Sequence, residues 1–416
     1  MLRRFLHSEV FRAPQRIAAA LLLVYLLQCV WLIRAQTLQA SVPDSDQALR
    51  IYAGLEQWKR GVIAGTPESL RSEAATGVPS AGRAGRLRVR DGFDQDRSPL
   101  YYLIAAAPLL LRSGSWLPES LQPLLAASPY LFFGVMLGAS LWYVARRLYG
   151  NAGGYIALAL YCFSPAMIVN TAGTQSLGEM GAVWGAFGTI FTAIAVAHTL
   201  YAPREVVLWN WRRTLLLGLS LALAAGNQFS LGVLALAILP LMLWVAPVRP
   251  RAVLVIWITA IAVGVVLLFA GYFFEPALFE QGMLHARWIN FEPAAFGVSV
   301  SYRNAWQTLF AGSPPLALAL PVALIAHMAW RRSRYFGNTA PLLIAALLLI
   351  LALGAPNFPG QGLQLTMLVF FFVFVSGVCA DLIETPQRQF VRAGLIGLLG
   401  ASGIWNMYQL WRVEFR

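Results

Sequence analysis

Two groups of aspartates lie in a long polar segment near the N-terminus. Asp44 and Asp46 occur in the stretch VPDSDQALRIYAGLEQWKRG, and Asp91, Asp94 and Asp96 occur in the stretch RDGFDQDRSPLYYLI. A carboxylate that reaches a hydroxyl group can act as a general base, and paired carboxylates with water suit Mg²⁺ or Mn²⁺. These aspartates are therefore the first residues to consider for a reaction.

The residues after the first pair of aspartates have helical spacing. Leu49, Tyr52 and Leu55 recur at intervals of three residues, which predicts a helix with the aspartates at its N-terminus. Capping of that helix by Ser45 or Asp46 would explain the same pattern without any chemistry.

The composition of the chain excludes an ordinary soluble domain. Of its 416 residues, 58% are hydrophobic and only 12% are charged, whereas about 25% of a soluble protein is charged. Several apolar stretches approach the roughly 20 residues that cross a bilayer as a helix. The sequence predicts an all-α polytopic membrane protein with about eleven spans, over residues 17–33, 124–145, 155–169, 182–200, 215–225, 231–245, 253–274, 316–330, 341–353, 365–382 and 393–410.

The arginines between these spans predict an orientation for the single transmembrane domain. They cluster at the N-terminus and at every second loop, which marks those parts as cytoplasmic. Residues 34–124 and 274–315 then form the two main outer loops. Within the first, the apolar piece from Pro99 to Leu111 is too short to cross and is expected to lie in the interface as a helix.

The basic N-terminus and the positive net charge are both explained by a membrane-spanning topology. No small-x-small cleavage site follows the first span, which favours an uncleaved signal anchor over a signal peptide. The formal net charge of +13 follows from the arginine clusters, so membrane lipids and not nucleic acid are the expected partners.

Five short motifs follow one another along the chain. The sequences SDQALRIYAGL, DRSPLYYLI and VARRLYG follow one another, and GGYIALALYCFSP and GEMGAVW come after them. This order resembles the GT-C superfamily of polyprenyl-phosphate-sugar-dependent glycosyltransferases, which includes protein O-mannosyltransferases and lipid A aminoarabinose transferases. The resemblance covers roughly the first half of the chain.

The resemblance implies a reaction and a catalytic residue. It places Asp46 at the family's catalytic carboxylate and Gln47 where a glutamate often stands. It implies an inverting transfer of a sugar from a polyprenyl-phosphate carrier to a lipid, glycan or protein acceptor, at the periplasmic face of a bacterial inner membrane. The chain departs from the family at residues 97–99, where RSP replaces the usual histidine or lysine and first proline, and at residues 354–364, which lack the arginine–tyrosine pair of the late outer loop.

Charged residues on the outer side are candidates for binding substrate. Arginine stabilises a departing lipid phosphate, and Arg97 is the first choice, with Arg287 and Arg303 in the second outer loop as further candidates. Snorkelling to lipid headgroups is the alternative for each arginine. Asp44 and Asp96 are also expected beside the substrate.

Three further residues are predicted at the same surface. Tyr101 and Tyr102 would stack on a sugar or anchor a helix among the headgroups. Glu179 lies at the outer end of a span, where an ionisable group raises a functional question and where simple exposure would also explain it. No cofactor is certain; a divalent cation at Asp44 and Asp46 stays open, and the cysteines and histidines form no metal-ligand pattern.

A transporter or flippase is the main alternative to an enzyme. It would need ionisable or broken-helix positions near the bilayer midplane, often in repeated halves. The stretch AAGNQFSLG, with Asn227 and Gln228, is the best argument for it, but no internal repeat is visible. A noncatalytic or O-antigen-polymerase-like protein is a third reading, although its main outer loop would more usually lie late in the chain.

Overall fold

Within the residues that the structure describes, every regular element is a helix. The computed structural model describes residues 13–39, 46–61, 93–113, 122–172, 179–201, 211–288, 291–329, 335–355, 361–383 and 388–414. Six helices in these ranges are long and apolar enough to cross a membrane. They are α2 (Ala13–Gln39), α6 (Gln122–Cys162), α8 (Met180–Thr199), α12 (Pro250–Gly271), α17 (Gly362–Ile383) and α18 (Arg388–Glu414). The prediction of a helical membrane protein is confirmed, and the number of eleven spans is not.

Four of the predicted spans fall on shorter helices. The 17 residues of α10 rise only about 25 Å, which is less than the roughly 30 Å of hydrocarbon. Together α14 and α15 form a pair bent by 99° that would make a seventh span. The shorter elements are α10 (Trp211–Asn227), η3 (Phe229–Val233) with α11 (Leu234–Val245), α14 (Ser299–Phe310), α15 (Pro314–Ala329) and α16 (Tyr335–Leu353).

The 41 residues of α6 are two helices that turn back on each other. Gly150 has φ 78° and ψ −172°, a conformation that glycine adopts without steric cost. The Tyr161 hydroxyl donates to the carbonyl of Gly134 at 2.7 Å, although a straight helix would hold these residues about 40 Å apart. The chain therefore reverses near Gly150, as the separate predictions for residues 124–145 and 155–169 require. The second of these is interrupted before α7 (Pro165–Ala172).

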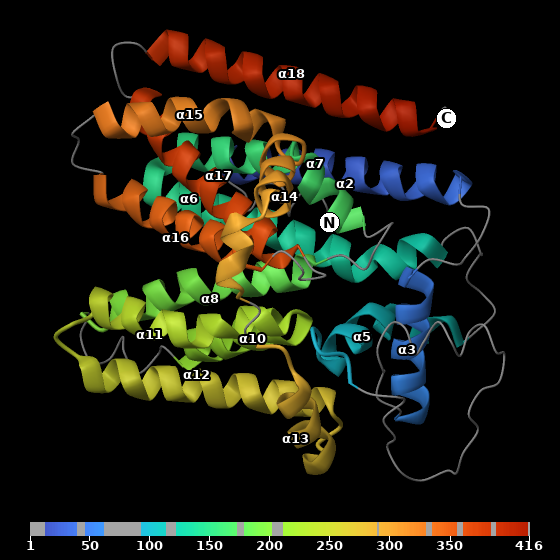
Figure 1. The fold of residues 1–416 in the computed structure, drawn as a ribbon. Coiled ribbons are helices and arrows are strands. Elements are labelled where there is room, and N and C mark those ends of the chain that lie inside the picture. Colours follow the sequence, from blue (N-terminus) through green and yellow to red (C-terminus); the bar gives the residue numbers. More distant parts are fainter. Residues whose placement is uncertain are drawn as a thin grey trace.

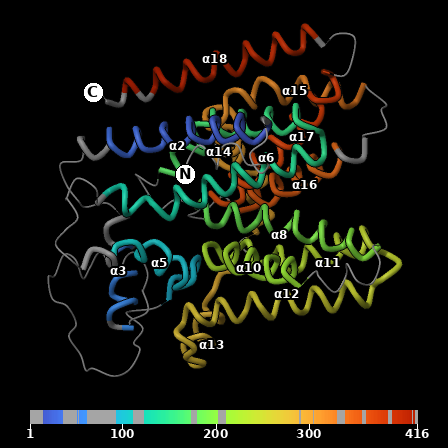
Figure 2. Tube along the Cα trace, turned by 180° about the vertical axis from the view of Figure 1, so that it is seen from behind, coloured from blue at the N-terminus to red at the C-terminus, as the bar shows by residue number. Residues whose placement is uncertain are grey.

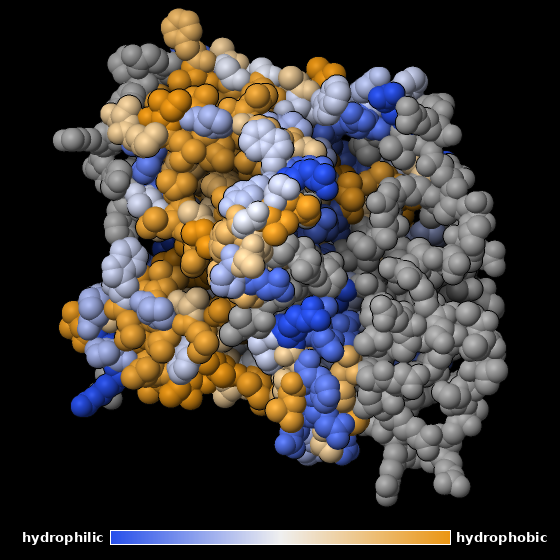
Figure 3. Space-filling model, viewed as in Figure 1, coloured by the Kyte–Doolittle hydropathy of each residue, from blue (hydrophilic) through white to orange (hydrophobic). Residues whose placement is uncertain are grey.

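The centre of the bundle is α17, whose residues are buried almost without interruption. A helix that is apolar on all sides needs neighbours on all sides, and α17 packs against α16, α6, α15 and α8. Figures 1 and 2 show α18 and α12 at opposite edges of the bundle. Both expose large apolar side chains, for example Ile396 and Ile258, which suits contact with lipid. Figure 3 shows hydrophobic side chains over α11, α12 and α16, with hydrophilic ones gathered around α13 (Pro276–His285).

Short helices lie at one end of the bundle. There α3 (Asp46–Arg60) packs against α5 (Pro99–Ala106), which continues as η1 (Ala107–Ser113). A Cβ atom at Gly54 would collide with the Tyr102 carbonyl oxygen, so glycine permits the close crossing. Trp58 also donates from Nε1 to the Leu103 carbonyl at 2.9 Å. The predicted helices after Asp46 and after Ser98 are thus confirmed, but α5 is mostly buried in protein.

Candidate functional site

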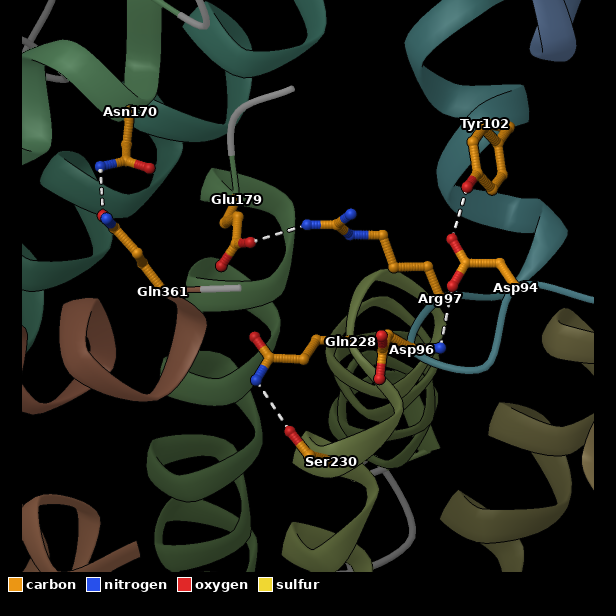
Figure 4. A network of polar contacts seen from close by, with 9 residues as sticks. All are labelled: Asp94, Asp96, Arg97, Tyr102, Asn170, Glu179, Gln228, Ser230 and Gln361. Carbon is orange, nitrogen blue, oxygen red and sulfur yellow. Dashed lines mark hydrogen bonds and ion pairs between the residues drawn. The ribbon is translucent and has the colours of Figure 1, made fainter. Parts of the chain in front are cut away.

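Several helix ends meet beside α5. There α8 begins after Glu179, α10 ends at Asn227 and α17 begins at Gly362. The segment Phe93–Ser98 is fastened to the break between α10 and η3, because Phe229 N donates to the Asp96 carbonyl at 2.9 Å and Ser98 N donates to the Gly226 carbonyl at 3.0 Å. Figure 4 shows the polar side chains that gather here. We call them the polar network; its members are Asp94, Asp96, Arg97, Tyr102, Asn170, Glu179, Gln228, Ser230 and Gln361.

The centre of the polar network is a buried ion pair. An Nη atom of Arg97 lies 3.0 Å from Oε1 of Glu179, and the two side chains are only 6% and 9% exposed. The guanidinium also lies over the ring of Tyr101, 4.7 Å from its centroid. Burial alone would lower the pKa of Arg97, but Tyr101, Glu179 and Asp94 outweigh it and raise that pKa. The arginine therefore stays charged. The alternative explanation for Glu179, simple exposure at the interface, is wrong because its side chain is buried.

Asp94 holds the local backbone together. Its Oδ2 accepts a hydrogen bond from the Tyr102 hydroxyl at 2.5 Å, and its Oδ1 accepts one from Asp96 N at 2.9 Å. Tyr101 and Tyr102 are each 1% exposed, so the alternative that they anchor a helix among the headgroups is wrong, and stacking on a sugar stays a prediction. A phenol group goes to the interior when its hydroxyl finds a partner there, and Asp94 supplies that partner.

Asp96 is the less satisfied carboxylate of the pair. Its Oδ1 lies 3.7 Å from an Nη atom of Arg287, too far for a hydrogen bond, and this oxygen has no hydrogen-bond partner within the described ranges. Burial raises the pKa of Asp96, while Arg287 opposes the rise and Asp94 adds to it. Arg287 also donates to Oε1 of Gln95 at 2.9 Å. The fold thus brings an arginine of the second predicted outer loop to the first.

The other predicted site residues lie apart from the polar network or outside the described residues. Asp46 is the first residue of α3, but its side chain, like the whole of Asp44, lies outside what the structure describes. The predicted meeting of the two aspartate groups and the cation at Asp44 and Asp46 therefore stay predictions. Arg303 is exposed on α14 and is not a member of the polar network.

The sequence alone predicted no enzymatic role for four members of the polar network, Asn170, Gln228, Ser230 and Gln361. Gln228, noted only as a helix interruption, is 1% exposed and donates from Nε2 to Ser230 Oγ at 2.8 Å. Asn170 donates from Nδ2 to Oε1 of Gln361 at 3.3 Å. The available signal was a polar residue at the edge of an apolar stretch, which Gln228 and Glu179 share.

Tyr102→Phe is expected to lower the free energy of unfolding by about 1–3 kcal/mol, because the change leaves an oxygen of buried Asp94 without its donor. Tyr302→Phe is the matched control, since the Tyr302 hydroxyl donates to the Phe296 carbonyl at an exposed position and should lose less than about 0.5 kcal/mol. Thermal unfolding of the purified protein in detergent measures both. Equal losses would contradict the role of Asp94.

No protein-family model, curated protein or solved structure matches the chain.

Proposed function

We propose that the chain is an inverting glycosyltransferase, which moves a sugar from a polyprenyl-phosphate carrier to a lipid, glycan or protein acceptor. We place the reaction at the periplasmic face of a bacterial inner membrane. The observation that supports this most is the buried Arg97–Glu179 pair, with Asp94 and Asp96 beside it, at one end of an apolar helical bundle. Burying charged groups there costs free energy, so buried charges at such a place often mark a functional site. The order of the sequence motifs supplies the reaction class.

The reaction needs a base and a group that receives negative charge. The acceptor hydroxyl oxygen attacks the anomeric carbon, the carbon–oxygen bond to the phosphate breaks, and the phosphate leaves with the electron pair. Asp46 takes the proton of the acceptor hydroxyl as general base. Attack opposite the leaving phosphate inverts the anomeric centre.

Arg287 fits the phosphate better than Arg97 does. The charge of Arg97 is already balanced by Glu179 at 3.0 Å, and its side chain is 6% exposed. The Arg287 side chain is 41% exposed and carries five N–H donors, of which Gln95 takes one. A guanidinium beside an interface binds phosphate through two parallel hydrogen bonds.

Arg287→Gln is expected to weaken the binding of polyprenyl phosphate by about 10- to 150-fold, because a hydrogen bond to a charged group contributes about 1.5–3 kcal/mol. Arg303→Gln removes an exposed arginine of the same outer segment and should leave the Kd within about twofold. Binding of labelled polyprenyl phosphate to protein in lipid nanodiscs gives both values. A Kd that moves equally in the two variants would show a general charge effect.

A transporter is the second candidate, because α10 ends at Asn227 and the buried Gln228 follows. Proteoliposomes loaded with a polyprenyl-phosphate-linked radioactive sugar separate the two. Label that appears in a new, water-soluble or differently migrating product indicates transfer, whereas label that changes leaflet while staying on the carrier indicates transport.

Mass spectrometry of the periplasmic lipids and glycans of a deletion strain would then identify the product, and unchanged glycans would count against the enzyme.

A further inference from the structure

Besides Oδ1 of Asp96, two buried acceptor oxygens in the polar network lack a donor among the described residues. Oε2 of Glu179 and Oε1 of Gln228 are enclosed, and neither has a hydrogen-bond partner in the described part of the chain. The residues are 7% and 1% exposed. Leaving such an atom without a donor costs free energy, and folded proteins seldom keep one without a reason.

The other polar atom of each group, the carboxylate of Glu179 and the amide of Gln228, is hydrogen-bonded, and this fixes the direction in which the unpaired oxygen points. Arg97 holds Oε1 of Glu179 at 3.0 Å, and the amide nitrogen of Gln228 donates to Ser230 at 2.8 Å. The remaining oxygens turn toward Gly362, the first residue of α17. A Cβ atom there would collide with Oε1 of Gln228 and lie 3.4 Å from Oε2 of Glu179. Figure 4 shows both side chains reaching into the same region.

The chemistry of this pair selects the kind of ligand. A site of acceptors without donors binds groups that bring donors. A phosphate would be repelled by the Glu179 carboxylate, and a cation gains little because Arg97 already balances that charge. Neutral hydroxyl groups remain. We propose that Glu179 and Gln228, beside Gly362, bind hydroxyl groups of the sugar on the carrier lipid.

This assignment rests on the proposed function and divides the donor between two places. The sugar lies at Glu179 and Gln228, and the phosphate lies at the exposed guanidinium of Arg287. Asp96 connects them, because its carbonyl accepts from Phe229 N next to Gln228 and its carboxylate faces Arg287. Since both acceptor oxygens are enclosed in the protein without ligand, sugar binding requires a local opening at this end of the bundle.

The test compares thermal unfolding of wild-type protein and Gln228→Met in detergent, alone and with two probes. One probe is a polyprenyl phosphate, and the other is the same lipid carrying glucose, mannose or galactose. In the wild type, one of the sugar-bearing lipids should raise Tm more than the bare lipid does. Gln228→Met removes an unpaired buried acceptor and also the donor to Ser230 Oγ, so these opposing effects should leave the Tm of the protein without ligand within a few degrees of the wild type. It should abolish the extra shift due to the sugar.

Two further variants test whether the loss of the sugar-dependent shift is specific to the proposed subsite. Gln28 is also a buried glutamine whose Oε1 has no hydrogen-bond partner in the described ranges, but it lies in α2 and donates to the Cys162 carbonyl. Gln28→Met should keep the sugar-dependent shift whatever it does to Tm. Gly362→Ala should lose that shift while Gln228 is intact, because its Cβ fills the place where the two oxygens meet.

The outcomes separate the subsite from the proposed function. A sugar-dependent shift of Tm that survives in Gln228→Met overturns the subsite. A rise in the Tm of the wild type that is as large when Na⁺ replaces choline in the buffer, without any lipid, also overturns the subsite, because it would indicate a cation site. Equal shifts with the bare and the sugar-bearing lipid overturn the subsite and leave carrier binding intact. If neither lipid shifts the wild type, the proposed function fails, and the subsite then stands only if free monosaccharides stabilise the wild type and not Gln228→Met.

Discussion

Replacing Glu179 by leucine is expected to destabilise the protein by about 3–5 kcal/mol, because the change leaves the Arg97 guanidinium buried and unpaired. Arg97 is only 6% exposed in its side chain, and Tyr101 and Asp94, which remain in the variant, still raise its pKa, so it cannot escape the cost by losing its proton. The cation–π contact with Tyr101 recovers only a small part, on the order of 1 kcal/mol. Chemical unfolding in detergent, followed by tryptophan fluorescence, measures the loss.

The double variant Arg97→Met with Glu179→Leu should recover most of that stability. Buried ion pairs are often replaced by apolar residues at little cost, whereas removal of one partner alone is costly. A double-mutant cycle of the two singles and the double therefore gives a large coupling energy. If the two losses simply add, the pair is not the unit that the 3.0 Å distance indicates.

Activity should separate from stability in the same set of variants. If the pair serves only to close the bundle, the double variant regains sugar transfer together with its fold. We expect transfer to stay low, because Glu179 is also needed to offer its second oxygen to the substrate. Regained transfer would confine the pair to a structural role.

Hydropathy is sufficient to place the helices, because an apolar run must satisfy its backbone hydrogen bonds internally wherever it lies in lipid. The helices that contain the predicted apolar stretches accordingly appear near their predicted positions, whereas α13 (Pro276–His285) and α14 (Ser299–Phe310) lie in residues 274–315, where only an outer loop was predicted. Counting the crossings is harder, because length decides it and residues 215–225 and 341–353 are borderline. The hairpin within α6 depends on one backbone conformation, that of Gly150, which a hydropathy pattern does not record.

The site was less predictable, because its contacts join residues far apart in the chain. Glu179 meets Arg97 across 82 positions, and Arg287 meets Gln95 across 192. Nothing in a local window tells whether a carboxylate at the end of a span faces water or an arginine. Tyr101 and Tyr102 were misplaced for the same reason, since burial of Tyr102 depends on Asp94 bending back toward its hydroxyl.

Asp46→Asn is expected to lower the rate of sugar transfer by about 10²–10⁴-fold, the usual contribution of a general base, without loss of the folded protein. Asp46 begins α3, where a carboxylate favours the helix by at most about 1 kcal/mol, so the amide should cost little stability. Glu275→Gln is the matched control, because Glu275 is an exposed carboxylate directly before α13 and should leave the rate unchanged.

Two aspartates, Asp46 and Asp96, compete for the role of general base, and their variants distinguish them. Asp96 is the rival, since it is partly buried, its Oδ1 has no hydrogen-bond partner in the described residues, and its pKa is raised. Asp96→Asn should weaken carrier binding through Arg287 and so act mainly on KM, whereas Asp46→Asn should act on kcat. Full transfer by Asp46→Asn together with a collapse of kcat in Asp96→Asn would move the base to the segment before α5, where the acceptor would have to approach from the Arg287 side.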